Sequence, residues 1–203
     1  MIGIVDYGRG NLRSVEKALH KLGYTARIMA EPQEIEPMQG IILPGVGAFG
    51  DAMAALERHG WVEPLLTAAR SGKPFLGICL GMQLLFSHGE EHGWHEGLGL
   101  LKGRVIHFPP GRKIPHMGWN NVSWVRESVL SRGIPDRSFF YFVHSYYAVP
   151  EDPEVVWGVA DYGVQFPAFV GRDNVWGTQF HPEKSSPWGL TLLDNFARQV
   201  NVR

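Results

Sequence analysis

Residues 74–86 read Pro-Phe-Leu-Gly-Ile-Cys-Leu-Gly-Met-Gln-Leu-Leu-Phe, and they decide how the rest of the chain is interpreted. The first part, residues 74–79, is an apolar run of the kind that forms a buried parallel strand. Residues 81–86 continue as a predicted helix. Cys79 ends the strand between Gly77 and Gly81. A nucleophile between two glycines at a sharp strand-to-helix turn is typical of a nucleophile elbow, here with cysteine in place of serine.

The residues before this turn alternate between short apolar runs and amphipathic stretches. Apolar runs at 2–5, 25–29 and 40–43 predict strands, and Pro44 is expected to end the last one. Helices are expected at 12–22, 51–58 and 61–70, the first capped by Asn11 and closed by Gly23. Strands alternating with helices at this spacing indicate a parallel sheet with helices on both faces.

The second half has a different pattern. Its expected strands are short, aromatic and β-branched, with turn residues between them. They cover 104–108, 121–125, 139–149, 155–160, 168–171 and 175–180, with a hairpin turn at 172–174 and a final helix from Pro187. We therefore expect an α/β fold: an open, mostly parallel sheet flanked by helices, with an antiparallel extension in the second half. Residues 1–203 are expected to form one domain.

Composition excludes several classes of function. Nineteen basic against twenty acidic residues give a formal net charge of −1, so no basic excess indicates a nucleic acid or a membrane surface as partner. One cysteine excludes an intrachain disulfide and any zinc site built on several cysteines. The N-terminus has an early Asp6 and no basic region, unlike a signal peptide. We expect a cytoplasmic protein.

Cys79 has two interpretations. A lone cysteine is usually a small, buried, structural residue. The flanking glycines favour a nucleophile, because they let the backbone pack closely where a Cβ would clash. A helix that begins at this point would stabilise a thiolate, and its free amides could hold an oxyanion.

A cysteine nucleophile needs a base, and the base needs a group that orients it. His181 ends the last predicted strand in the string Gln-Phe-His-Pro-Glu, at 179–183. If the extended geometry persists through Pro182, then His181 and Glu183 point to the same side. Strand ends of a parallel sheet meet at one edge, so His181 is expected near Cys79. The alternative is a surface His-Pro-Glu turn.

Two further patterns suggest a cofactor or a metal. Residues 45–50 match the G-x-G-x-x-G pattern of a dinucleotide loop, but no ribose-binding acid follows at the end of the next strand. We expect this loop to supply an oxyanion donor instead. A histidine cluster resembles a metal site, but Gly89 and Gly93 interrupt any helix that would align it. That cluster comprises His88, His92 and His95 with Glu90 and Glu91. Neither a cofactor nor a metal is expected.

Five strings together resemble the class I, triad-type glutamine amidotransferases. They are 44–50 (PGVGAFG), 77–86 (GICLGMQLLF), 115–120 (PHMGWN), 142–146 (FVHSY) and 181–186 (HPEKSS). The likeness runs from end to end, and the third and fifth strings make it closest to the glutaminase subunits of imidazole glycerol phosphate synthases. It implies one class I glutamine amidotransferase domain, with no attached synthetase domain.

The resemblance also implies roles for individual residues. Cys79 would attack the side-chain amide of glutamine to form a γ-glutamyl thioester, His181 would move protons, and Glu183 would orient His181. Amides of Val46, Gly47 and Leu80 would stabilise the oxyanion. The positions that match those holding the substrate glutamine are Gly45, Gln83, Glu91, His144, Ser145 and Tyr146.

In that family, ammonia passes to a separate (β/α)₈-barrel cyclase, with which the glutaminase forms a heterodimer in histidine biosynthesis. The cyclase makes imidazole glycerol phosphate and an aminoimidazole carboxamide ribotide. Asn11, Trp119, Tyr141 and Lys184 match its docking face, although aromatic residues such as Trp119 are more often in a core. Two alternatives remain: another cysteine hydrolase on the same scaffold, such as a peptidase, and a nucleotide-binding module that uses residues 45–50.

Overall fold

A sheet of parallel strands forms the centre of the computed structural model, which describes residues 1–201. Its strands are β1 (Ile2–Val5), β2 (Ala26–Met29), β3 (Gly40–Gly45), β4 (Phe75–Cys79) and β13 (Val175–Thr178), adjacent in the order β2-β1-β3-β4-β13. Most of these strands are buried along their whole length, which explains their continuous apolar sequences. Pro44 does not end β3, because the strand continues to Gly45, which pairs with Cys79.

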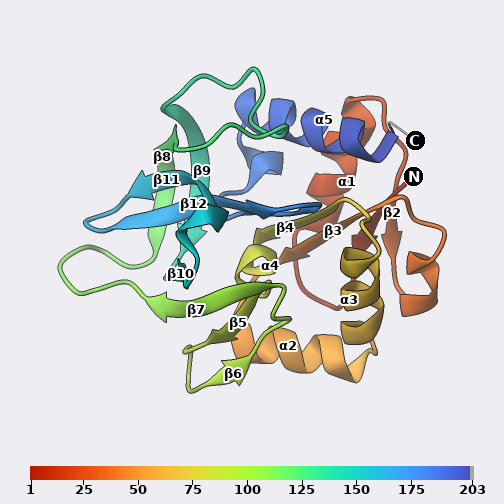
Figure 1. Ribbon diagram of the computed structural model, residues 1–203, viewed down its shortest axis with the longest axis horizontal. Coiled ribbons are helices and arrows are strands. Elements are labelled where there is room, and N and C mark those ends of the chain that lie inside the picture. Colours follow the sequence, from red (N-terminus) through yellow and green to blue (C-terminus); the bar gives the residue numbers. More distant parts are fainter. Residues whose placement is uncertain (202–203) are drawn as a thin grey trace.

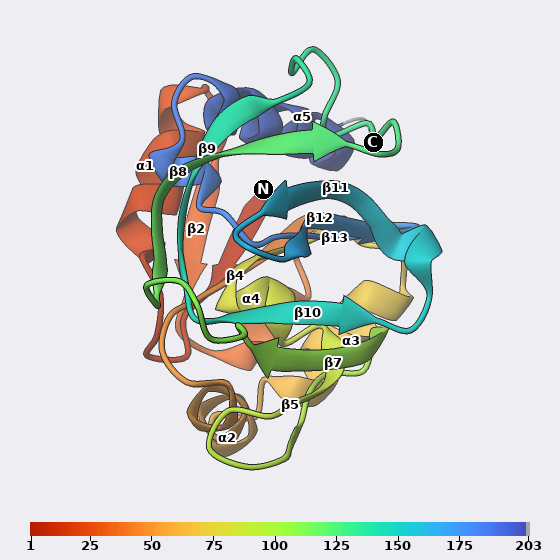
Figure 2. The same cartoon turned by 90° about the vertical axis from the view of Figure 1, so that its left-hand side faces the viewer.

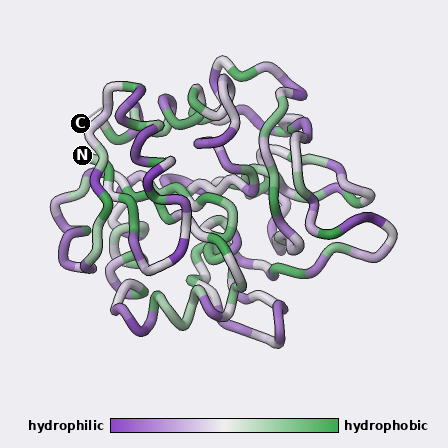
Figure 3. The backbone as a smooth tube through the Cα atoms, turned by 180° about the vertical axis from the view of Figure 1, so that it is seen from behind, coloured by the Kyte–Doolittle hydropathy of each residue, from purple (hydrophilic) through white to green (hydrophobic). Residues whose placement is uncertain are grey.

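Helices cover both faces of this sheet (Figure 1). On one face lie α1 (Leu12–Lys21) and α5 (Trp188–Asn201), and on the other lie α2 (Phe49–Arg58) and α3 (Val62–Arg70). Successive strand residues serve the two faces in turn: Ile42 packs in the same core as the α1 and α5 side chains, whereas Ile41 and Leu43 join the core beneath α2 and α3. The hydrophobic residues gather along these inner strands (Figure 3).

Four antiparallel strands extend the same sheet beyond β13. They are β12 (Gln165–Arg172), β11 (Val156–Asp161), β8 (His116–Trp124) and β9 (Ser138–His144), in that order. Arg172 pairs with Val175, which confirms the expected hairpin turn between β12 and β13. The α/β class and the antiparallel extension are confirmed. The extension is larger than expected, since the sheet has as many antiparallel as parallel pairings.

A second sheet lies beside the first (Figure 2). It consists of β10 (Tyr146–Pro150), β7 (Leu101–His107), β5 (Phe86–Gly89) and β6 (His95–Glu96), in that order. The expected strand 139–149 is therefore wrong as one element, because the chain leaves the first sheet at Ser145 and joins the second. The expected helix 81–86 is also shorter, because α4 covers only Leu80–Gln83. Phe86 already belongs to β5, where it pairs with Leu101 of β7.

The remaining elements are three 3₁₀ turns, at Pro32–Ile35, Pro153–Val155 and Pro182–Lys184, of which the last is η3. Asn11 stands at the N-cap position of α1 as expected, but its side chain accepts a hydrogen bond from the Ser14 hydroxyl rather than from a backbone amide. Within residues 1–201, no helix is both long and apolar enough to cross a membrane.

Candidate active site

Cys79 occupies a strained turn between β4 and α4. Its φ is 56° and its ψ is −111°, a region that residues other than glycine rarely adopt. Both flanking glycines are required by packing. A Cβ at Gly81 would lie 1.8 Å from the carbonyl oxygen of Leu43, and a Cβ at Gly77 would lie 2.6 Å from that of Gly81. The structure thus gives these glycines the role expected of them in a nucleophile elbow.

This packing predicts a large cost for Gly81→Ala. The added Cβ would meet the backbone of β3, which cannot move without disturbing the central sheet. We expect the free energy of unfolding in urea to fall by about 3 kcal/mol or more. Gly72→Ala is the control, because its Cβ would meet nothing within 4 Å although its φ is +82°, and it should cost only about 1 kcal/mol. Equal urea midpoints for Gly81→Ala and the unchanged protein would contradict the packing argument.

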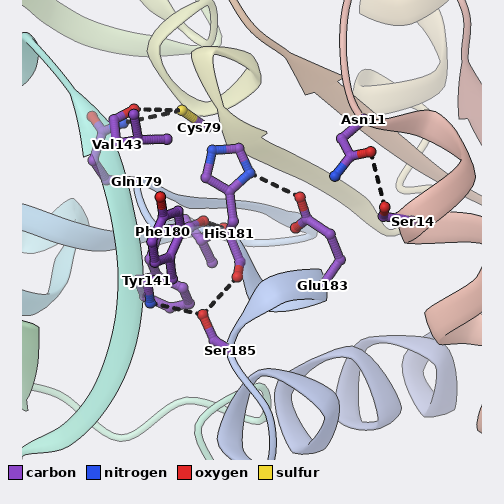
Figure 4. Close-up of polar contacts among 11 residues, drawn as sticks. Asn11, Ser14, Cys79, Tyr141, Val143, Gln179, Phe180, His181, Glu183 and Ser185 are labelled. Carbon is purple, nitrogen blue, oxygen red and sulfur yellow. Dashed lines mark hydrogen bonds and ion pairs between the residues drawn. The ribbon is translucent and has the colours of Figure 1, made fainter. Parts of the chain in front are cut away.

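His181 and Glu183 follow β13, the strand next to β4. Nδ1 of His181 lies 2.8 Å from Oε1 of Glu183, and both side chains are almost completely buried. The extended path through Pro182 expected from the sequence is wrong, because residues 182–184 form the 3₁₀ turn η3. The turn itself brings the glutamate back to the imidazole. Figure 4 shows the imidazole ring of His181 between Cys79 and Glu183.

Cys79 and Glu183 together favour the protonated form of His181. Burial alone would lower the pKa of His181, but the neighbouring Cys79 and, after it, Glu183 outweigh burial and raise this pKa to about 10. Nδ1 is held by Glu183, so Nε2 is the nitrogen left to face the thiol. An imidazolium in this position pairs with a thiolate and can later deliver its proton to a leaving group.

Ser185 fixes the turn that carries the base. Its hydroxyl donates to the carbonyl oxygen of His181 at 2.6 Å and accepts from the backbone amide of Tyr141 at 2.9 Å. It thereby ties η3 to β9 (Figure 4). Ser185 belongs to the string at 181–186, but its role is not visible in the sequence, because its partner on β9 lies 44 residues away.

A cavity of about 390 Å³ opens above Cys79. The residues that line it come from six separate parts of the chain: Val46, Gly47, Ala48, Cys79, Leu80, Gln83, Glu91, Pro115, Val143, His144, Ser145, Tyr146 and His181. It therefore brings together every residue expected to bind glutamine or the oxyanion except Gly45. A larger hollow, of about 680 Å³ between Trp124 and Ile134, shares no residue with it.

Gly45 lies behind the cavity. A Cβ there would be 2.4 Å from the hydroxyl of Tyr7 and 3.1 Å from the Cβ of Leu80. The Tyr7 hydroxyl is buried, and its pKa is raised by that burial. Gly45 thus gives a buried phenol room beneath the loop rather than lining the substrate cavity.

Two backbone segments can stabilise an oxyanion. Leu80 is the first residue of α4, and amides of a first helical turn have no acceptor within the helix. The loop of Val46 and Gly47 begins beside the nucleophile, since Gly45 pairs with Cys79. This loop is secured at its far end by Glu91, whose Oε2 accepts from the backbone amide of Phe49 at 3.0 Å.

His144 is neutral and engaged within the protein. Burial lowers its pKa to about 3, and its Nδ1 lies 2.8 Å from the carbonyl oxygen of Tyr146. It therefore shapes the cavity wall instead of offering a cation to a substrate carboxylate. Glu91 and the backbone of residues 143–146 remain the groups on this side that a glutamine amine and carboxylate could meet.

The expected docking residues lie on the outer side of β8, β9 and η3. Trp119 is 55% exposed, and its ring meets that of Tyr141 edge to face at 6.2 Å. The amine of Lys184 lies 5.7 Å from the centre of the same tyrosine ring. Asn11 begins α1, which packs against η3. The alternative interpretation, that Trp119 is a core residue, is wrong.

The side chains of the histidine cluster at 88–95 do not point to a common centre. His88 stacks on Trp94, Glu90 pairs with Arg104 at 3.2 Å, and Glu91 turns to Phe49. Across residues 1–201, no group of three or more histidine, cysteine, aspartate or glutamate side chains has a geometry that could hold a metal ion.

A glycine-flanked cysteine, a buried histidine and glutamate, and the first turn of a helix at one sheet edge define a cysteine-dependent acyl-transfer site. The glutamine amidotransferase class-I family model matches residues 3–200. The chain therefore belongs to the class-I glutamine amidotransferases, and the resemblance inferred from the motifs is confirmed.

The curated relatives narrow this class. A protein of Desulfitobacterium hafniense named imidazole glycerol phosphate synthase subunit HisH is 68% identical over 201 residues, which cover 99% of this chain and 95% of the relative. A HisH of Moorella thermoacetica is 54% identical, covering 98% of this chain and 95% of that protein. The solved structure of PurLQS from Thermotoga maritima matches the fold, with a TM-score of 0.80 at 22% identity and 98% coverage of both chains.

Proposed function

We propose that this chain hydrolyses glutamine to glutamate and ammonia, and that it supplies the ammonia to a cyclase subunit that makes imidazole glycerol phosphate in histidine biosynthesis. The observation that carries the proposal is the cavity in which Cys79 and His181 meet beside the first turn of α4. The 68% identity to a HisH supports the pathway. Residues 1–203 act as a single amidotransferase domain in the cytoplasm, where a nucleophilic thiol stays reduced.

In the first half of the reaction, Cys79 acts as nucleophile. Its sulfur forms a bond to the side-chain amide carbon of glutamine, and the carbonyl oxygen becomes an oxyanion. The amides of Leu80 and of the Val46-Gly47 loop stabilise that charge. When the tetrahedral intermediate collapses, the carbon–nitrogen bond breaks and His181 gives its proton to the departing ammonia.

In the second half, water hydrolyses the γ-glutamyl thioester. His181, now neutral, takes a proton from the attacking water while Glu183 holds its Nδ1. A second tetrahedral intermediate forms at the same oxyanion site. Its collapse breaks the carbon–sulfur bond, releases glutamate and restores the thiol of Cys79, so the cycle consumes only glutamine and water.

Glutamine fits the cavity as substrate through its α-amino and α-carboxylate groups. The Glu91 carboxylate suits the amine, while the backbone of the Ser145-Tyr146 segment suits the carboxylate. Gln83 lines the wall between them, and its NH₂ is held by Tyr146 and Gln179. A cavity of about 390 Å³ admits an amino acid, whereas a peptidase would need a groove for a longer chain.

The partner is a (β/α)₈-barrel cyclase that docks on the exposed face formed by Trp119, Tyr141 and Lys184, with Asn11 beside it. This face holds a ring pair and a cation over an aromatic ring, features common in interface cores. We expect docking to shift the glycine-rich loop toward the state that stabilises the oxyanion.

The proposal predicts that glutaminase activity depends on the partner. Steady-state glutamate release should be low for the chain alone and rise with the cyclase, then further with the cyclase and its nucleotide substrate, by on the order of a hundredfold in all. Equal turnover in all three conditions would exclude the switch. Absence of glutamate release in every condition would overturn the proposed activity.

Trp119→Ala tests the docking face in the same assay. We expect weaker binding to the cyclase by about 2 kcal/mol or more, because exposed tryptophans at interfaces are frequent hot spots. Trp94→Ala is the matched control, since Trp94 is 61% exposed but lies in the connection between β5 and β6. Equal effects of the two substitutions on the dissociation constant would place the partner elsewhere.

A further inference from the structure

A continuous hydrogen-bond chain of buried side chains reaches the nucleophile from behind. Nε2 of Gln83 lies 3.0 Å from the carbonyl oxygen of Tyr146 and 3.0 Å from Oε1 of Gln179. Nε2 of Gln179 lies 3.8 Å from Sγ of Cys79, within hydrogen-bond range for sulfur. Gln179 is fully buried and does not line the substrate cavity, so its side chain meets the sulfur but not the substrate.

The carbonyl of Tyr146 fixes the direction of this chain. A backbone carbonyl only accepts hydrogen bonds, so the group of Gln83 that faces it must be the NH₂. The same NH₂ faces Gln179, which must therefore present its oxygen to Gln83. The remaining group of Gln179, its NH₂, is thereby aimed at the sulfur. The donor toward Cys79 follows from the network and not from an arbitrary assignment of the amide atoms.

Two neutral histidines support the same carbonyl from the other side. His144 donates from Nδ1 to Tyr146, so its Nε2 must accept, and Nδ1 of His116 supplies that donor at 2.9 Å. Burial lowers the pKa of His116 to about 4 and that of His144 to about 3, which keeps both rings neutral and their tautomers fixed. Nδ2 of Asn120 then donates to Nε2 of His116 at 3.3 Å.

We propose that Gln179 is a positioning residue for the nucleophile: its side-chain NH₂, oriented through Gln83 and the Tyr146 carbonyl, donates to Sγ of Cys79 and stabilises the thiolate. A second contact holds the neutral thiol, because Sγ lies 3.8 Å from the carbonyl oxygen of Val143. A carbonyl oxygen repels a thiolate, whereas an NH₂ attracts it. Gln179 therefore favours the charged form that attacks substrate.

Other ionisable groups also lie around the sulfur. His181 faces it from the end of β13, and Tyr7 faces it from the end of β1. Glu91, His144 and Tyr146 border the same cavity. Gln179 differs from all of these in being uncharged at every pH, so its removal changes a hydrogen bond without removing a charge.

The test uses the pH dependence of Cys79 alkylation by iodoacetamide, with the full chain and no glutamine. Cys79 is the only cysteine, so the rate reports on this sulfur alone. Gln179→Met and Gln179→Leu each remove the donor and introduce no charge. We expect the midpoint of the rate–pH profile to rise by about one pH unit, the effect of losing a hydrogen bond to a charged group.

Thr178→Val is the matched control. Thr178 is the fully buried neighbour on β13, and its hydroxyl donates to the carbonyl oxygen of Phe180 at 3.0 Å, away from the sulfur. This substitution should leave the alkylation midpoint unchanged. An unchanged midpoint in both Gln179 variants, or an equal shift in Thr178→Val, would overturn the proposal.

Kinetics with glutamine provide a second readout. Because Gln179 does not line the cavity, kcat should fall by about tenfold while KM stays the same. A rise in KM alone would show that Gln179 acts on substrate binding and would refute the role in positioning. The alkylation result requires no glutaminase activity, so failure of this inference is distinguishable from failure of the proposed function.

Discussion

Replacing Cys79 by alanine is expected to lower kcat for glutamine hydrolysis on the order of 10⁴-fold or more, the scale on which loss of a nucleophile acts. No other residue of the chain can form the thioester, since this is its only cysteine. The cyclase partner should nevertheless keep its synthetic activity when ammonium is added, because only cleavage of the amide requires the thiol. The measurement is glutamate release beside synthesis from ammonium, with the same preparation of complex.

Cys79→Ser is the control for structure. It keeps a small side chain with a donor in the strained turn, and it should share the loss of activity while binding the cyclase normally. Loss of the ammonium-dependent activity in a properly folded complex of either variant would contradict the proposed division of labour between the subunits.

Glu183→Gln is expected to lower kcat by about 10³- to 10⁴-fold, the cost seen when the orienting acid of a triad becomes an amide. The reason is the contact of 2.8 Å between the carboxylate and Nδ1 of His181. A glutamine can turn its NH₂ to Nδ1, which would place the imidazole proton on Nε2 and point the wrong tautomer at the thiol.

The pH profile of this variant has a definite sign. Cys79 and Glu183 both raise the pKa of His181, to about 10, against the effect of burial. Removing the glutamate charge lowers this pKa, so the alkaline decline of kcat should move to lower pH. Glu16→Gln, which breaks the exposed pair with Arg13 on α1, should leave the profile unchanged. Activity of Glu183→Gln within tenfold of the unchanged protein would remove Glu183 from the catalytic machinery.

The central parallel strands and the proximity of Cys79, His181 and Glu183 could be predicted, because each of them depends on local sequence. Buried parallel strands have continuous apolar sequences, and their ends meet at one edge of the sheet. This rule placed Cys79 and His181 together although they are about a hundred residues apart. The path to Glu183 was wrong in detail, since a 3₁₀ turn replaced the extended strand.

Long-range pairing could not be predicted in the same way. Tyr146 begins a strand of the second sheet because of its partner on β7, and nothing local in 139–149 marks the break at Ser145. The short length of α4 also has a long-range cause, because Phe86 pairs with Leu101 of β7 and so belongs to a strand instead of the helix. The contact of Gln179 with Gln83 joins residues 96 positions apart, and each alone reads as an ordinary polar residue.

The most direct test of the central claim, that Cys79 is the nucleophile, is labelling with a glutamine analogue that carries an electrophilic carbon in place of the side-chain amide. The complex with the cyclase is incubated with the analogue, and both residual activity and the modified peptide are followed by mass spectrometry. We expect one label per chain on Cys79, loss of activity in proportion to labelling, and protection by glutamine. Loss of activity with the label on another residue, and with Cys79 unmodified, would contradict it.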